Sequence, residues 1–149
     1  MERQSPGSIS QSSLVGESRL LFNQGIAKRP ALVNDGRLRH QVSKTPLWDQ
    51  AEQVTLSVGP ALKVPLAYQQ KVFIEIGRNQ EQVPLSELSY LLIYKDRNQL
   101  QHAEVVTQIP DDTYWTHRNE PGRKFSGIII VEDWWGRPIK TFKKTPQQQ

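Results

Sequence analysis

Two aromatic pairs are the residues in this sequence whose chemistry is best suited to binding. Tyr114 and Trp115 fall in a long loop-like stretch, and Trp134 and Trp135 stand beside a turn at Arg137. Neighbouring strand residues point to opposite faces, so one of Trp134 and Trp135 faces away from the core unless a bulge or second layer covers it. An exposed indole anchors a protein partner or stacks on sugars and bases. The structural alternative is one indole in the core and the other capping the end of the domain.

Residues suited to acid–base chemistry are present without a diagnostic arrangement. His117 oriented by Asp112 is a conceivable general base, with Ser126 as one possible nucleophile. No G-x-S-x-G elbow, P-loop or G-x-G-x-x-G accompanies them. The absence of cysteine excludes thiol chemistry, and three histidines leave little for a zinc centre. We therefore expect a non-enzymatic protein without a cofactor or metal, and a small hydrolase using His117 and Asp112 is the third hypothesis.

The positive charge is concentrated in the N-terminal third. Residues 1–46 hold seven Lys and Arg against three Asp and Glu, which accounts for the whole net charge of +4, while residues 47–149 hold twelve of each. A basic arm beside a neutral body fits either an anionic partner or a solvated tail. If the last hairpin gathers the loop 118–124 with Arg137, Lys140, Lys143 and Lys144 beside the tryptophans, a basic aromatic face for single-stranded nucleic acid results.

The composition of the N-terminal segment predicts an arm outside the folded domain. Residues 1–18 are rich in Ser, Gln and Gly, which predicts disorder. Between 19 and 46, Gly25, Pro30 and Gly36 leave no room for a helix longer than about two turns. We expect an extended, partly disordered arm that orders on its own domain or on a partner. Its candidate docking residues are Leu20, Leu21, Phe22, Leu32 and Val33.

From residue 47 the pattern changes to short runs of β-type residues separated by turns. Strands are predicted at 54–58, 71–76, 89–94, 100–107, 125–132 and 139–143, with one short helical turn at 86–88. The hairpin 128–142 resembles the last hairpin of many immunoglobulin-like modules. These strands predict an all-β domain, an immunoglobulin-like sandwich or small barrel, over residues 47–145, followed by a polar tail at 146–149.

The predicted organisation favours a non-enzymatic protein-interaction module, a structural or accessory subunit of a larger assembly. It would dock a protein partner or a second copy through the arm and the aromatic hairpin, with binding residues that include Trp115, Trp134, Trp135 and Arg137. The alternative is a ligand-binding β module that stacks carbohydrate or single-stranded nucleic acid on exposed tryptophans. No apolar run is long enough to span a membrane. We expect the cytoplasm, or an extracytoplasmic compartment if a signal has been removed.

Overall fold

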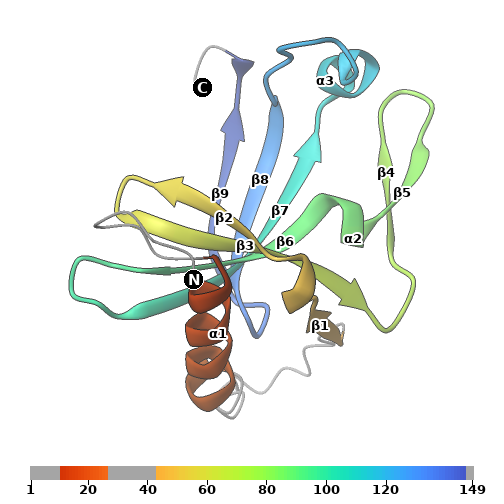
Figure 1. The fold of residues 1–149 in the computed structure, drawn as a ribbon. Coiled ribbons are helices and arrows are strands. Elements are labelled where there is room, and N and C mark those ends of the chain that lie inside the picture. The colour runs from red at the N-terminus through yellow and green to blue at the C-terminus, as the bar shows by residue number, and fades with distance from the viewer. Residues whose placement is uncertain (1–10, 27–42, 147–149) are drawn as a thin grey trace.

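The computed structural model describes residues 11–26 and 43–146, and Figure 1 shows their arrangement. The described chain forms a seven-stranded antiparallel sheet and a separate two-stranded hairpin. The strands are β1 Lys44–Pro46, β2 Glu52–Leu56, β3 Gly59–Tyr68, β4 Phe73–Ile76, β5 Glu81–Pro84, β6 Ser89–Lys95, β7 Gln101–Pro110, β8 Gly127–Asp133 and β9 Pro138–Lys144. The helices are α1 Gln11–Leu21, α2 Leu85–Leu88 and α3 Asp112–His117, with a π-helical turn Phe22–Ile26 after α1 and a 3₁₀ turn Trp48–Gln50.

The large sheet has the order β1-β3-β6-β7-β8-β9, and β2 also pairs with β3. The strands β6 to β9 follow one another as antiparallel neighbours, so each connection along this half of the sheet is a hairpin or a loop between adjacent strands. At the other end, β1 and β2 pair with successive parts of the long strand β3. The sheet therefore has β9 as one of its edges.

One face of the sheet is covered by α1. Side chains alternate along a strand, so the even-numbered apolar residues of β3 and the odd-numbered ones of β6 and β7 share this face. The buried cluster there contains Phe22, Trp48, Ala51, Leu62, Val64, Leu66, Leu91, Ile93, Ala103 and Val105, with Leu14, Val15, Tyr68 and Trp134 packed against it. Burial of each large aliphatic side chain stabilises the fold by about 1.5–3 kcal/mol.

Two smaller clusters complete the packing. Val106, Ile129 and Val131 are buried with Phe125 and Tyr90 in one of them. In the other, the β4–β5 hairpin packs its buried residues against α2 and α3. That cluster contains Ile76, Val83 and Leu88, with Ile74, Ile109 and Trp115 against them.

The predicted mostly-β fold is confirmed, and its antiparallel sheets are consistent with a sandwich or small barrel. The strands predicted at 89–94, 100–107, 125–132 and 139–143 correspond to β6, β7, β8 and β9, and the helical turn at 86–88 falls in α2. Within the described ranges, no helix is long and apolar enough to cross a membrane.

Three local predictions are wrong. Residues 11–18, predicted to be disordered, begin α1, and the helical stretch runs on to Ile26 in place of the extended chain expected from residue 19. The stretch around Tyr114 and Trp115, predicted to be a loop, contains the short helix α3. The longest strands include β3, which the sequence analysis did not identify. Residues 1–10, 27–42 and 147–149 lie outside the described chain, and with them Leu32, Val33 and most of the predicted tail.

Candidate functional site

Phe22 attaches the N-terminal helix to the sheet. Its side chain is 2% exposed and makes edge-to-face contacts with two indoles, Trp48 at 5.6 Å and Trp134 at 4.8 Å between ring centroids. Aromatic pairs in this geometry contribute about 0.5–1.5 kcal/mol beyond the burial of their area. Two of the predicted docking features, the arm residue Phe22 and the hairpin residue Trp134, therefore contact each other.

Lys44 contacts the Trp134 ring as well. Its Nζ lies 4.3 Å from the ring centroid and donates a hydrogen bond of 2.7 Å to the Trp134 carbonyl oxygen. Burial lowers the pKa of Lys44, while the nearby carboxylates of Glu132 and Asp133 act in the opposite direction. Trp134 thus contacts both Lys44 of β1 and Phe22 of the π-helical turn after α1.

Two leucines at the end of α1 are exposed. Leu20 is 56% exposed and Leu21 is 36% exposed, whereas Ser18 and Phe22 are buried. The helix is held beside the β6–β7 hairpin by an ion pair between Glu17 and Lys95 and by a hydrogen bond of 3.3 Å from Gln101 Nε2 to the Ser18 carbonyl oxygen. The arm residues Leu20 and Leu21 are therefore presented to solvent on an ordered helix.

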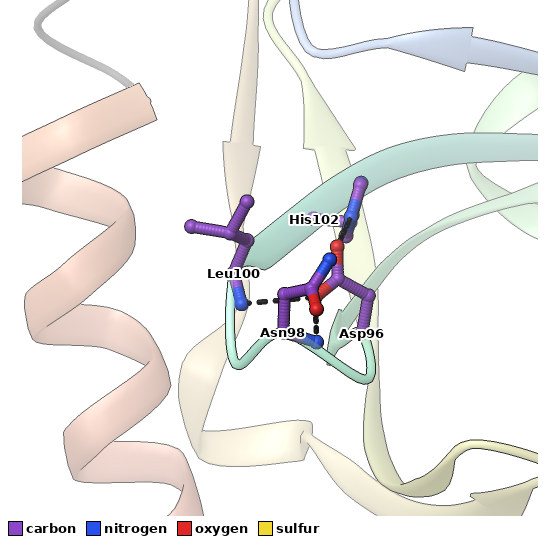
Figure 2. Close-up of polar contacts among 4 residues, drawn as sticks. All are labelled: Asp96, Asn98, Leu100 and His102. Atoms are coloured by element: carbon purple, nitrogen blue, oxygen red, sulfur yellow. Dashed lines mark hydrogen bonds and ion pairs between the residues drawn. The ribbon is translucent and has the colours of Figure 1, made fainter.

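The turn between β6 and β7 is fixed by Asp96, as Figure 2 shows. One carboxylate oxygen accepts hydrogen bonds from the backbone N–H groups of Asn98 and Leu100, at 2.8 and 3.1 Å. The other lies 2.8 Å from His102 Nε2. The hydrogen bond with His102, followed by those from the backbone, lowers the pKa of Asp96. With its backbone held this way, the turn presents Leu100 at 63% exposure on a defined scaffold.

A groove lies between α1 and the tips of the β2–β3 and β6–β7 hairpins. This helix groove encloses about 210 Å³, and its apolar lining comes from Leu14, Leu21, Val58, Pro60 and Ile93. Polar residues of the lining include Glu17, Lys95, Gln99 and Gln101. Two apolar residues of the lining are themselves exposed, Leu21 at 36% and Val58 at 42%, and Leu20 and Leu100 are next to lining residues in the chain. An apolar hollow with a polar rim is the composition of a protein-docking surface.

Sequence analysis identified Leu20 and Leu21 as candidates in this region but missed Val58 and Leu100. Both residues were placed at the ends of predicted strands, Val58 at the end of 54–58 and Leu100 at the start of 100–107. An apolar residue in a strand carries no signal of a binding role by itself, because it is expected to pack in the core, and isolated exposed hydrophobic residues are common on protein surfaces. The groove becomes visible only when the three segments are brought together.

Trp115 belongs to a different part of the molecule. It lies in α3, which is capped by Asp111, whose Oδ1 accepts hydrogen bonds from Tyr114 N at 2.7 Å and Ser126 Oγ at 2.9 Å. The indole Nε1 donates to Glu81 Oε2 at 3.1 Å, and the guanidinium of Arg118 lies 3.8 Å from the indole centroid. The Trp115 indole is consequently half-buried and in contact with Glu81 and Arg118.

A second concavity, the α3 groove, is lined by four aromatic side chains. Tyr90, Tyr114, Trp115 and Phe125 contribute to a volume of about 380 Å³. Lys63 Nζ lies 4.5 Å from the centroid of Tyr90, and burial raises the pKa of the Tyr90 phenol. The volume and the aromatic lining are within the range of small-ligand sites.

The catalytic pairing considered from the sequence is not formed. Asp112 makes an ion pair with Arg78 at 3.1 Å, and His117 Nδ1 lies 3.1 Å from Glu120 Oε1. The Asp112 carboxylate therefore contacts Arg78 in the β4–β5 turn and does not orient the imidazole of His117. Among residues 11–26 and 43–146, no three His, Asp or Glu side chains gather as a metal-binding group.

The aromatic hairpin is more covered than its sequence indicated. Trp134 and Trp135 are both half-buried, and Phe22 of the π-helical turn after α1 packs on the Trp134 ring. Asp133 Oδ1 accepts hydrogen bonds from the backbone N–H groups of Trp135 and Arg137, at 2.8 and 2.9 Å. Neither indole is the exposed stacking surface that was considered, while Arg137 is exposed.

Most basic residues of the predicted face lie away from the tryptophans, and Arg137 alone of that set shares their turn. Lys143 and Lys144 pair with Ile128 and Gly127 at the start of β8, whereas Trp134 and Trp135 follow its end. The loop 118–124 leads into the start of β8, so it lies at the lysine end of the hairpin. The predicted single face of basic and aromatic residues is therefore divided between the two ends of a strand.

The chain matches no protein-family model, no curated protein and no solved structure.

Proposed function

We propose that this chain is a non-enzymatic protein-interaction module, an accessory or structural subunit of a larger assembly, and that it docks a protein partner on the helix groove. The observation that supports this proposal is the apolar hollow beside α1, whose lining includes the exposed residues Leu21 and Val58. The arm contributes to docking as an ordered helix: Phe22 holds it to the sheet, Leu21 lines the groove, and Leu20 is exposed next to it.

The energetics favour a few anchor residues at this site. Leu20 and Leu100 are both more than half exposed in the free chain. Covering each of them contributes about 1–2 kcal/mol, as the exposed part of a leucine side chain leaves water. The rigid turn at Asp96 and the docked helix keep the ordering cost of binding low. The burial of these two side chains is therefore expected to contribute favourably to binding.

Site-specific photo-crosslinking in the source cells tests the proposal. A photoreactive Leu100→p-benzoylphenylalanine variant should form a discrete crosslinked protein adduct, since position 100 lies beside the groove. The matched control is Phe73→p-benzoylphenylalanine, because Phe73 is 48% exposed on the separate β4–β5 hairpin. The same adducts at both positions, or none at position 100, would refute docking at this groove.

A second candidate function, a ligand-binding module, is favoured by the α3 groove with its aromatic lining. Carbohydrate or single-stranded nucleic acid would lie against Tyr90 and Tyr114, with Lys63 and Arg118 at hand for polar contacts. Titration with neutral oligosaccharides and with an oligothymidylate, followed by tryptophan fluorescence, tests it. A Trp115→Phe variant should lose the response, and in the nucleic-acid case the affinity should fall steeply with salt.

A further inference from the structure

The sheet ends in an open edge strand. Within residues 11–26 and 43–146, β9 pairs with β8 and with no other strand, and Figure 1 shows it along the outer side of β8. Its residues from Pro138 to Lys143 are all exposed. An edge strand points alternate N–H and C=O groups away from its sheet, which makes it a template for a further strand. The helix groove includes the start of β7, and β8 lies between β7 and β9, so the edge is a second surface.

The charge of this edge has one sign. The stretch 134–146 contains Arg137, Lys140, Lys143 and Lys144 and no Asp or Glu. The residues of β8 that pair with β9 are apolar or glycine apart from Glu132, which lies opposite Pro138 at the far end of the ladder. A strand added here therefore meets positive charge along most of its length.

The register defines what each position of the added strand would meet. Lys140, Phe142 and Lys144 lie opposite Val131, Ile129 and Gly127, and alternate residues of a strand share a face. On that face β9 carries a cation, an aromatic ring and a second cation, in that order. The aromatic residue, Phe142, is 41% exposed. The pattern is symmetric about Phe142.

A second copy of the chain fits this edge poorly. Two β9 strands paired in antiparallel fashion about Phe142 would place Lys140 of each copy opposite Lys144 of the other. Like charges directly opposite each other destabilise a pair of strands. Pairing of β9 with the β9 strand of a second copy is therefore disfavoured, and a strand of opposite charge is favoured.

We propose that β9 accepts, by antiparallel strand addition, an extended segment of a partner protein that carries carboxylates at two positions flanking an apolar residue, in the pattern acid-x-apolar-x-acid. The carboxylates lie opposite Lys140 and Lys144, and the apolar residue packs on Phe142. Backbone hydrogen bonds along the edge supply affinity, and the alternate side chains supply specificity. Lys140 and Lys144 lie symmetrically on either side of Phe142. The charge and the spacing of the partner's side chains are therefore the features that β9 recognises.

The test uses the full chain and three synthetic peptides that differ only in charge: acetyl-TETVTET-amide, acetyl-TQTVTQT-amide and acetyl-TKTVTKT-amide. Amide NMR spectra at low salt report where each peptide binds. We expect the acidic peptide to shift the amides of β9 and to bind about 2- to 30-fold more tightly than the glutamine peptide, because it adds two cross-strand charge pairs. The lysine peptide should bind least.

A charge swap provides the matched control. A Lys140→Glu, Lys144→Glu variant should reverse the preference toward the lysine peptide, whereas Lys71→Glu with Arg97→Glu, two exposed sites away from β9, should keep the original order. Equal affinity for all three peptides, shifts outside β9, or no binding would overturn the proposal. In the last case the lysines only protect the edge from association. None of these outcomes bears on crosslinking at Leu100, which tests the helix groove separately.

Discussion

At the scale of single residues, Phe22 and Asp96 shape the helix groove. Phe22 places α1 against the sheet by inserting between Trp48 and Trp134. Asp96 fixes the opposite wall by accepting two backbone hydrogen bonds and contacting His102. One residue acts through apolar packing and the other through charge and hydrogen bonds. Each therefore has a distinct experimental signature.

Replacing Phe22 by alanine should release α1 from the sheet. Truncating a buried phenylalanine costs about 3–5 kcal/mol, which here reduces the stability of the docked helix. We expect the amides of α1 to lose protection from hydrogen exchange while those of β6 and β7 keep theirs. Leu20→Ala is the control, because Leu20 is exposed and its truncation should change stability by no more than about 0.5 kcal/mol. Unchanged protection in Phe22→Ala would contradict the anchoring role.

Asp96 should make the β6–β7 turn sensitive to acid. Its pKa is lowered from the ordinary value of 3.8 in the folded chain, chiefly by the hydrogen bond with His102. A lowered folded pKa gives stability that is fully present above about pH 4 and is lost as the pH falls through the folded value. The difference in urea midpoint between the native chain and Asp96→Asn should therefore shrink below about pH 4. Asp49→Asn, at an exposed site, serves as control, and a difference that stays constant down to low pH would refute the assignment.

At the scale of elements, the β7–β8 connection depends on a close backbone approach. Gly127 begins β8 with φ of +149°, and a Cβ at this position would lie 2.2 Å from the Ile109 carbonyl oxygen. The strand cannot pair with β7 in this way if residue 127 has a side chain. Gly16 in α1 is the opposite case, since a Cβ there would meet no atom within 4 Å.

Alanine at these two glycines should therefore change stability in opposite directions. Gly127→Ala should destabilise the domain by more than about 1 kcal/mol, because both the backbone conformation and the space are unfavourable. Gly16→Ala should stabilise α1 by about 0.5–1 kcal/mol, since alanine has the higher helix propensity. Urea midpoints and the hydrogen exchange of α1 provide the measurement. Destabilisation by Gly16→Ala would show that α1 is not helical at this residue.

The elements that could be predicted are those whose pattern is local. The strands β6, β8 and β9 follow from runs of apolar residues bounded by turn residues. α1 was missed because its apolar residues Leu14, Val15 and Phe22 were divided at residue 18 between a polar segment and an arm. β3 was missed because Pro60 and Pro65 argue against a central strand.

At the scale of the whole molecule, the candidate docking surface is built from distant parts of the chain. The helix groove combines α1, the β2–β3 turn and the β6–β7 hairpin. Spacing in the sequence identifies Leu20 and Leu21, but it contains no information on which turns will face them, because that depends on the order of strands in the sheet. At the aromatic hairpin, spacing in the sequence indicated an exposed indole, but tertiary packing of Phe22 partly covers Trp134.

The central claim is that the chain docks a protein partner through the helix groove. The most direct measurement is the size of the tagged chain in extracts of its source cells, by size-exclusion chromatography with light scattering. We predict a species larger than the free chain, reduced to the free chain by Leu21→Ser with Val58→Ser, two exposed residues of the groove lining, and unaffected by Phe73→Ser. A chain that elutes alone, or a complex that survives the groove substitutions, would contradict the claim.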